Sequence, residues 1–448
     1  MAGEWVAQTI DESMAAIIDY RGKTPRKTTA GVPLITAKVV KGGRIETPDE
    51  FIAESDYTEW MRRGIPEPGD VVVTTEAPLG EVAQLGNERV ALAQRLICLR
   101  GKPGVLSNGF LKFLMQSDAV QEQLHSRASG TTVLGIKQSE LRKVVLLLPP
   151  IEEQRAIAHI LGTLDDKIEL NRRMSETLDA MARALFKAWF VDFEPVRAKH
   201  ALSKVEGIEG RWQRGQSLPG LPTHLYDLFP DRLVDSSLGA IPQGWEVKII
   251  DDLAEIIGGS TPSTVQPAYW DDGIHCWATP KDLSALKAPV LLNTERRVTD
   301  AGLAQISSGL LPKGTVLLSS RAPIGYLAIA EVPVAINQGF VAMKPRTGVP
   351  NLFLLLWARA AHEDILARAN GSTFLEISKA NFRPLRVVGP PLSVLNAFDR
   401  IARPMYERIV FIERESNALA TLRDTLLPML ISGELRLKNA AWLAEVAA

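Results

Sequence analysis

The chain has 448 residues, of which 46% are hydrophobic and 23% are charged, and its net charge is −1. These fractions are typical of globular proteins and exclude a disordered or fibrous chain, and the length predicts two or more domains. A balanced net charge excludes a general affinity for polyanions, so any nucleic-acid contact must depend on local charge.

Targeting and redox signals are absent from the sequence. The longest apolar runs, such as Val144–Leu148, are far shorter than the roughly 18–20 residues of a membrane span, and the N-terminus does not resemble a signal peptide. We expect a cytoplasmic protein with no membrane contact. Cys98 and Cys276 form neither a disulfide framework nor a metal-binding pair, so we interpret both as core thiols.

The first half begins with a basic stretch, Tyr20–Arg44, that contains no acidic residue. Presented on one face, its side chains would neutralise several phosphates, although a solvated lysine-rich surface explains them equally well. Short runs rich in Val, Ile and Leu follow at Asp70–Thr75 and Ala91–Leu99 and predict β-strands, and Phe110–Arg127 has a helical pattern.

The periodicity changes after Pro149-Pro150, where apolar positions begin to recur at steps of four and three residues. This heptad seam predicts one helix over 151–190, on the order of 55 Å long at 1.5 Å per residue. Its positions are Ile157, Leu161, Leu164, Ile168, Asn171, Ser175, Leu178, Ala182, Leu185 and Trp189. The next segment, 191–244, is rich in proline and glycine and predicts a structured linker.

The second half repeats the first at a distance of roughly 240 residues. Strands are expected at Thr315–Ser319 and Val334–Lys344 and a helix at Leu352–Arg368, before a second double proline, Pro390-Pro391. Matching phrases include Ala77-Pro78-Leu79-Gly80 with Ala322-Pro323-Ile324-Gly325, Gln94 with Gln338, and Gly130–Ile136 with Gly371–Ile377. A second seam then runs from Phe398 to Leu430, and we expect Pro404 to kink or divide that helix near its start.

The predicted fold is α+β, with an internal pseudo-two-fold repeat. Two similar mixed α/β domains, 1–150 and 245–390, are separated by two long antiparallel helices, 151–190 and 391–437, that form an intramolecular coiled coil. The alternative use of such helices is a plain hairpin that packs each half's core. The linker covers 191–244 and a tail covers 438–448.

Motifs for chemistry are missing from the sequence. No phosphate-binding G-x-x-x-x-G-K-[ST] loop occurs, and no Asn-Pro-Pro-aromatic or Asp-Pro-Pro-Tyr tetrapeptide that would indicate base methylation. The six histidines have no metal-ligand spacing. We therefore expect a non-catalytic chain with no metal and no cofactor of its own.

Several phrases resemble the specificity subunit of Type I restriction-modification systems, over essentially the whole chain. They include Pro149-Pro150-Ile151-Glu152-Glu153-Gln154-Arg155, Leu164–Glu169, Lys187-Ala188-Trp189-Phe190, Ile241–Trp245, Asn337-Gln338-Gly339-Phe340 and Leu426–Leu435. The resemblance implies two target-recognition domains that each read one half of a bipartite, asymmetric DNA site, with the helices as a ruler. It also implies partners: double-stranded DNA, two methyltransferase subunits that bring S-adenosylmethionine, and restriction subunits that use ATP and Mg. The second helix entry, Pro390–Asn396, lacks the Glu-Glu-Gln-Arg of the first.

Candidate DNA-binding residues are basic, amide and hydroxyl side chains in the repeated loops and the basic stretch. In the first domain they are Arg21, Lys23, Arg26, Lys27, Lys38, Lys41, Gln94, Arg95, Thr131, Thr132 and Lys137. In the second domain they are Lys281, Ser320, Arg321, Asn337, Gln338, Ser372, Thr373 and Lys379. Partner binding is expected on exposed helix faces, at Gln154, Arg155, Lys167, Asn171 and Arg172.

The residues alone leave one other function open. A non-catalytic adaptor or scaffold could use the coiled coil for assembly and the two globules to bind other proteins. Binding to a bipartite duplex in preference to random duplex would separate the two hypotheses.

Overall fold

A computed structural model describes residues 4–20, 24–205, 223–371 and 375–437 of the chain. It divides into two compact units. The first unit comprises Met1–Glu169 with Asn417–Ala448, and the second unit comprises Leu170–Ser416. Each unit therefore contains one globular half and parts of both long helices.

The first unit is built on a four-stranded antiparallel sheet. In spatial order its strands are β2 (Met14–Asp19), β11 (Leu96–Gly101), β8 (Val71–Thr75) and β9 (Leu79–Gln84). Helix α3 (Asn108–Gln116) packs on β8, β9 and β11, with α4 (Asp118–Ser126) beside it, because Phe110, Leu111 and Leu114 recur at helical spacing. The region expected as one helix is thus two short helices that meet at Ser117.

Smaller elements complete this unit. A second sheet has the order β10-β4-β7-β3, and β1 pairs with β12 in a separate ribbon. The remaining bounds are β1 (Val6–Thr9), α1 (Ile10–Ser13), β3 (Lys27–Thr28), β4 (Val32–Ile35), β5 (Val40–Lys41), β6 (Arg44–Ile45), β7 (Phe51–Ile52), α2 (Glu54–Trp60), β10 (Ala91–Leu92), α5 (Gln138–Leu141) and β12 (Val145–Leu148).

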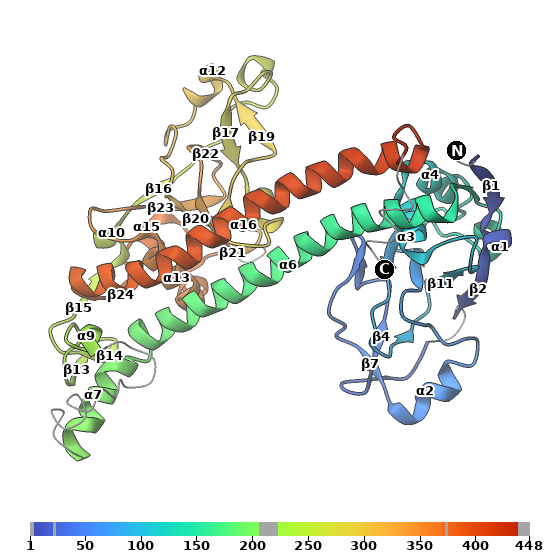
Figure 1. Cartoon of the computed structure of the whole chain (residues 1–448). Coiled ribbons are helices and arrows are strands. Elements are labelled where there is room, and N and C mark those ends of the chain that lie inside the picture. Colours follow the sequence, from blue (N-terminus) through green and yellow to red (C-terminus); the bar gives the residue numbers. More distant parts are fainter. Residues whose placement is uncertain (1–3, 21–23, 206–222, 372–374, 438–448) are drawn as a thin grey trace. The chain divides into compact units, whose positions relative to one another are not determined.

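The second unit repeats this plan (Figure 1). Its main sheet has the order β16-β23-β20-β21-β18, with α13 (Asn351–Ala360) packed on β20, β21 and β23. The strands are β16 (Ala254–Gly258), β18 (Val290–Leu291), β20 (Val316–Ser320), β21 (Ile324–Ala330) and β23 (Phe340–Pro345). A smaller sheet contains β19 (Arg296–Val298), β17 (His275–Ala278) and β22 (Val334–Ile336), and β15 (Glu246–Ile249) pairs with β24 (Arg386–Gly389). The other elements are α7 (Glu194–Val205), α9 (Thr223–Tyr226), β13 (Leu233–Ser236), β14 (Gly239–Pro242), α10 (Ile250–Leu253), η1 (Pro267–Tyr269), α11 (Pro280–Ser284), α12 (Asp300–Leu303), α14 (His362–Ala367) and α15 (Lys379–Phe382).

The structure corrects two strand predictions at equivalent places. The run Ala91–Leu99 forms β10 and β11, and Val334–Lys344 forms β22 and β23. In the first unit β10 joins the second sheet and β11 joins the main sheet. In the second unit β22 joins the smaller sheet and β23 joins the main sheet. Because both strands are buried, hydrophobicity alone gives no sign of the change of sheet at Gln94 and Gln338.

The two long helices are α6 (Ile151–Phe190) and α16 (Leu392–Ser432). In the first unit Asp165 of α6 faces Arg423 of α16, and in the second unit Asn171 faces Ser416 and Ser175 faces Glu413. Partner numbers fall as α6 advances, so the antiparallel pairing predicted from the seams is confirmed. Pro404 does not divide α16, which stays helical through Pro404 because the loss of one backbone hydrogen bond is outweighed by packing along the buried seam.

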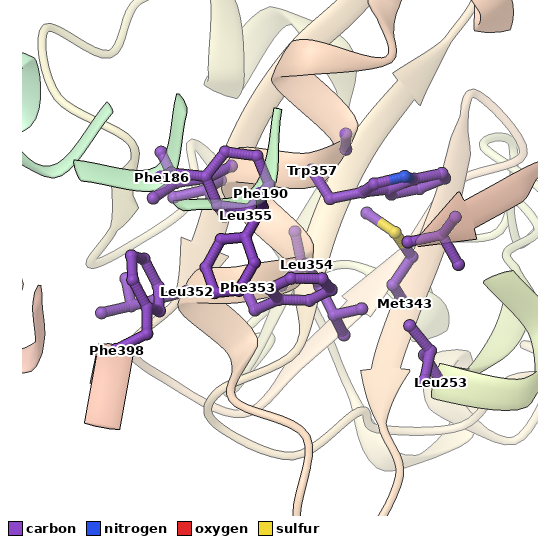
Figure 2. Close-up of a cluster of buried hydrophobic side chains, with 14 of the residues drawn as sticks. Phe186, Phe190, Leu253, Met343, Leu352, Phe353, Leu354, Leu355, Trp357 and Phe398 are labelled. Carbon is purple, nitrogen blue, oxygen red and sulfur yellow. The ribbon is translucent and has the colours of Figure 1, made fainter. Parts of the chain in front are cut away.

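An aromatic cluster closes the end of α6 in the second unit (Figure 2). Phe190 packs against Phe353 of α13 and Phe398 of α16, each with ring centroids 5.1 Å away. From the linker, Phe229 meets Trp189 edge to face at 5.0 Å. The described part of the linker is therefore packed against the helix end.

Candidate DNA interface

In the first unit three loops meet at the end of β8. The Thr75 amide donates to the Arg95 carbonyl, and the Ile136 amide donates to the Thr75 carbonyl. Thr131, Thr132 and Lys137, all exposed, lie on the third loop, which Ser129 and Gly135 close with paired backbone hydrogen bonds. The fold thus places Gln94, Arg95 and this loop together. Arg95 already has a carboxylate partner, because its Nε lies 2.9 Å from Glu76.

The equivalent loops of the second unit meet in the same way at the end of β20. The Ser320 amide donates to the Gly339 carbonyl, and the Ile377 amide donates to the Ser320 carbonyl. Arg321 lies 3.7 Å from Glu376. Ser320 itself is buried, so the structure gives it no surface for a base contact. Ser372 and Thr373 lie outside the described residues.

The other candidates of the second unit surround this point. Thr261 donates to the Gln338 side chain at 2.5 Å, and the Asn337 side chain accepts from the Gly339 amide at 2.9 Å. Lys379 is exposed beside Gly258, and Lys281 pairs with Glu295 at 2.7 Å. Hydrogen bonding to Glu295 raises the pKa of Lys281 above its usual value. Gln338 and Lys379 therefore remain accessible polar groups. To contact DNA, Lys281 must give up its ion pair with Glu295 for one with a phosphate.

The basic stretch is largely neutralised by acids that follow it. The pairs are Lys27 with Glu50 at 2.8 Å, Lys38 with Asp49 at 2.6 Å, and Lys41 with Glu46 at 3.2 Å. A hydrogen bond to Asp49 raises the pKa of Lys38. Of the two interpretations left open for this stretch, the pairing favours a solvated surface for these three lysines, because the acids of residues 46–50 fold back beside them. Arg26 is exposed and has no carboxylate partner among the described residues, and Arg21 and Lys23 lie outside them.

Two of the five partner-binding candidates are not on an exposed face. Gln154 is buried and donates to the carbonyls of Val105 and Pro149, and Asn171 is fully buried, donating to Glu415 at 2.7 Å. The expectation of exposure is wrong for both because seam and cap positions of a long helix point inward. The other three are accessible: Arg155 is exposed, and Lys167 and Arg172 are half-buried.

Sequence reasoning missed an exposed arginine on β19. Arg296 stacks its guanidinium 3.6 Å from the ring centroid of Trp270 and 5.4 Å from that of Trp277. The signal in the sequence was the pair Arg296-Arg297, which lies outside the phrases that match between the two halves.

The residues that the structure describes contain no group of three or more His, Cys, Asp or Glu side chains that could hold a metal ion. None of the helices in these ranges is long and apolar enough to cross a membrane. Cys98 and Cys276 are buried free thiols.

The duplicated architecture has a direct counterpart among known families. The model for the Type I restriction modification DNA specificity domain matches residues 20–180 and again residues 242–399. The chain belongs to this family. The first match covers most of the first globular half and extends into α6, and the second covers the second globular half and the start of α16. The family therefore accounts for both halves of the repeat.

Individual members of the family align over most of their length. The specificity subunit of the Type I restriction enzyme HindI from Haemophilus influenzae is 26% identical over 384 residues, or 78% of this chain and 82% of the relative. The MjaIX specificity subunit from Methanocaldococcus jannaschii is 25% identical over 91% of this chain and 88% of its own. The crystal structure of an S subunit from M. genitalium has a TM-score of 0.54 with 16% identity, over 95% of this chain and 96% of that one, which shows the shared fold. Membership supports DNA specificity and gives no support to the adaptor alternative.

Proposed function

We propose that this chain selects the DNA sequence on which a Type I restriction-modification complex acts. The observation that carries the proposal is the match of the DNA specificity family to both halves of the chain, which the structure builds on one plan. Each domain would read one half of a bipartite site. The binding of each domain to its half-site would be weak, and the chain would bind specifically only where both half-sites are present at the correct distance.

The long helices are proposed to set that distance. Helix α6 has 40 residues, which corresponds to about 60 Å or about 17–18 base pairs of duplex. Adding seven residues to both helices would lengthen each by about 10 Å, so the spacer between the half-sites should grow by about 3 base pairs. An unchanged spacer in the recognised motif would contradict this role.

The chemistry is assigned to partners. We propose that two methyltransferase subunits supply S-adenosylmethionine, that restriction subunits supply ATP-dependent translocation and cleavage with Mg, and that this chain binds no cofactor. The complex would act in the cytoplasm, where the host DNA lies. The accessible side chains of Arg155, Lys167 and Arg172 are candidates for contacts with these partners.

The deciding experiment is single-molecule sequencing of host DNA for methylated adenine. We expect a two-part asymmetric motif that disappears when this gene is deleted and returns when it is restored. Persistence of every such motif in the deletion strain would contradict the proposal. Gel shifts of the complex with methyltransferase partners should favour a duplex with both half-sites over random duplex, and a duplex with altered spacing is the matched control.

A further inference from the structure

The β19 edge of the second unit holds an arginine on an aromatic platform. The Trp270 indole N–H donates to the Ser263 carbonyl at 3.0 Å, and its ring meets that of Trp277 edge to face at 4.9 Å. Trp277 is buried and donates to the Ser260 carbonyl at 3.3 Å. Arg296 lies over Trp270 at 3.6 Å. Cation–π stacking on a ring fixed from two sides orients the plane of the guanidinium before any ligand arrives.

The charge of Arg296 is also available. Among the described residues no carboxylate lies within ion-pair distance of it, whereas Arg321 and Lys281 are both paired with glutamates. Stacking uses the face of the guanidinium and leaves its in-plane N–H donors. Two parallel donors of this kind match the O6 and N7 acceptors of guanine in the major groove.

The first unit has the opposite charge at the matching position. In the second unit Ala335 of β22 and Arg296 of β19 both pair with Trp277. In the first unit Ala91 of β10 pairs with Leu34 of β4. The Leu34 amide donates a hydrogen bond to the carbonyl of Glu50. Because Ala91 and Ala335 occupy equivalent places before Gln94 and Gln338, Arg296 corresponds to Glu50.

This difference distinguishes base reading from phosphate binding. A phosphate contact carries no sequence information and would be equally useful in both domains. Here the second domain has the guanidinium of Arg296, and the first has the carboxylate of Glu50, which is paired with Lys27. Such a difference is expected where two domains of the same fold recognise different base sequences.

We propose that Arg296 is a specificity-determining residue that donates its guanidinium edge to a guanine in the half-site read by the second domain. Trp270 is its positioning residue. This inference rests on the proposed function and adds one base contact to it.

The experiment uses full-length variants expressed with their partner subunits in a host that lacks the native gene, followed by sequencing of methylated DNA. Arg296→Ala should make the motif degenerate at one G·C pair in one half and leave the other half unchanged. Discrimination at that pair should fall by about 5- to 150-fold, as for the loss of a bidentate base contact. Arg296→Lys should relax the same position, because an ammonium cannot form the two parallel bonds.

The matched control is Arg297→Ala. Arg297 has the same charge on the same strand but lies on the opposite face, where it donates to the Ile274 carbonyl and the Asn293 side chain, and its loss should leave the motif intact. For the platform, Trp270→Leu should relax the same base pair as Arg296→Ala, whereas Trp270→Phe should retain it.

Three results would overturn the inference. Uniformly weaker binding with an unchanged motif and a salt slope reduced by about 1 would make Arg296 a phosphate contact. Full retention of the motif by Arg296→Lys would reduce its role to charge, and an unchanged motif in Arg296→Ala would exclude a role in reading. Failure of the proposed function is distinguishable, because then the motif would not depend on this gene at all.

Discussion

Replacing Asp165 by asparagine is expected to destabilise the first unit by about 2–3 kcal/mol. Asp165 of α6 accepts from Lys112 of α3 at 2.5 Å and from Arg423 of α16 at 2.8 Å. The three side chains are 13%, 12% and 24% exposed respectively. Removing one partner of a fully buried ion pair costs about 3–5 kcal/mol, and partial exposure of Arg423 reduces this figure.

The pH dependence follows from the same contacts. Burial would raise the pKa of the Asp165 carboxyl, but Lys112 and Arg423 outweigh burial and hold this pKa below 3.8. A lowered pKa in the folded state contributes stability above the unfolded value, and this contribution is lost as the pH falls through the folded value. The difference between Asp165→Asn and the parent should therefore be constant from pH 5 to 8 and shrink below about pH 3.8.

The effect of Asp165→Asn is measured by hydrogen exchange with mass spectrometry, because this method reports local stability in a chain of two units that need not unfold together. Faster exchange is expected in peptides from 151–169 and 417–432. Asp166→Asn is the matched control, since Asp166 is exposed on the same helix turn. A loss below about 0.5 kcal/mol, or an equal loss in the control, would refute the reasoning.

Three further changes test the packing and charges of each unit. Phe353→Ala should destabilise the second unit by about 3–5 kcal/mol in thermal unfolding, because it leaves a cavity beside Phe190, and Phe353→Leu should cost clearly less. Glu413→Gln should raise the unfolding free energy at pH 7 in chemical denaturation and leave it unchanged near pH 4. Burial raises the pKa of Glu413, so its charged form is disfavoured in the folded state, while glutamine can still accept from Ser175. Arg436→Ala should destabilise the first unit and speed hydrogen exchange over 430–437, because it removes both bonds, at 2.7 and 2.8 Å, to the buried carboxylate of Glu153. An unchanged exchange rate would contradict this.

The long helices and the repeat were predictable because they depend on periodicity. A heptad seam kept over about five heptads predicts one helix and a partner for its stripe, and α6 has the expected bounds. The strands were predictable only as apolar runs. Nothing local marks the point where Val334–Ile336 leaves the small sheet and Phe340 enters the main one, since both sheets bury their strands.

Charge was the least predictable property of the candidate interface. Residue types indicated that Lys27, Lys38 and Lys41 could bind phosphate, but acids 23, 11 and 5 residues further along the chain lie beside them. Such pairing depends on turns such as β5–β6 that place residues side by side. Arg296 shows the converse, because its availability depends on a tryptophan 26 positions earlier in the chain.

The comparison of β7 with β19 shows how one plan can give two readers. At the buried end of each strand Ile52 and Val298 both pack into a core, so folding holds these positions to the same chemistry. At the other end, the half-buried Glu50 directly before β7 and the exposed Arg296 of β19 carry opposite charges, and no packing requirement links them. A duplicated domain can therefore change the residues at these strand ends without changing its core. This freedom explains how a chain with a repeated fold would recognise an asymmetric DNA site.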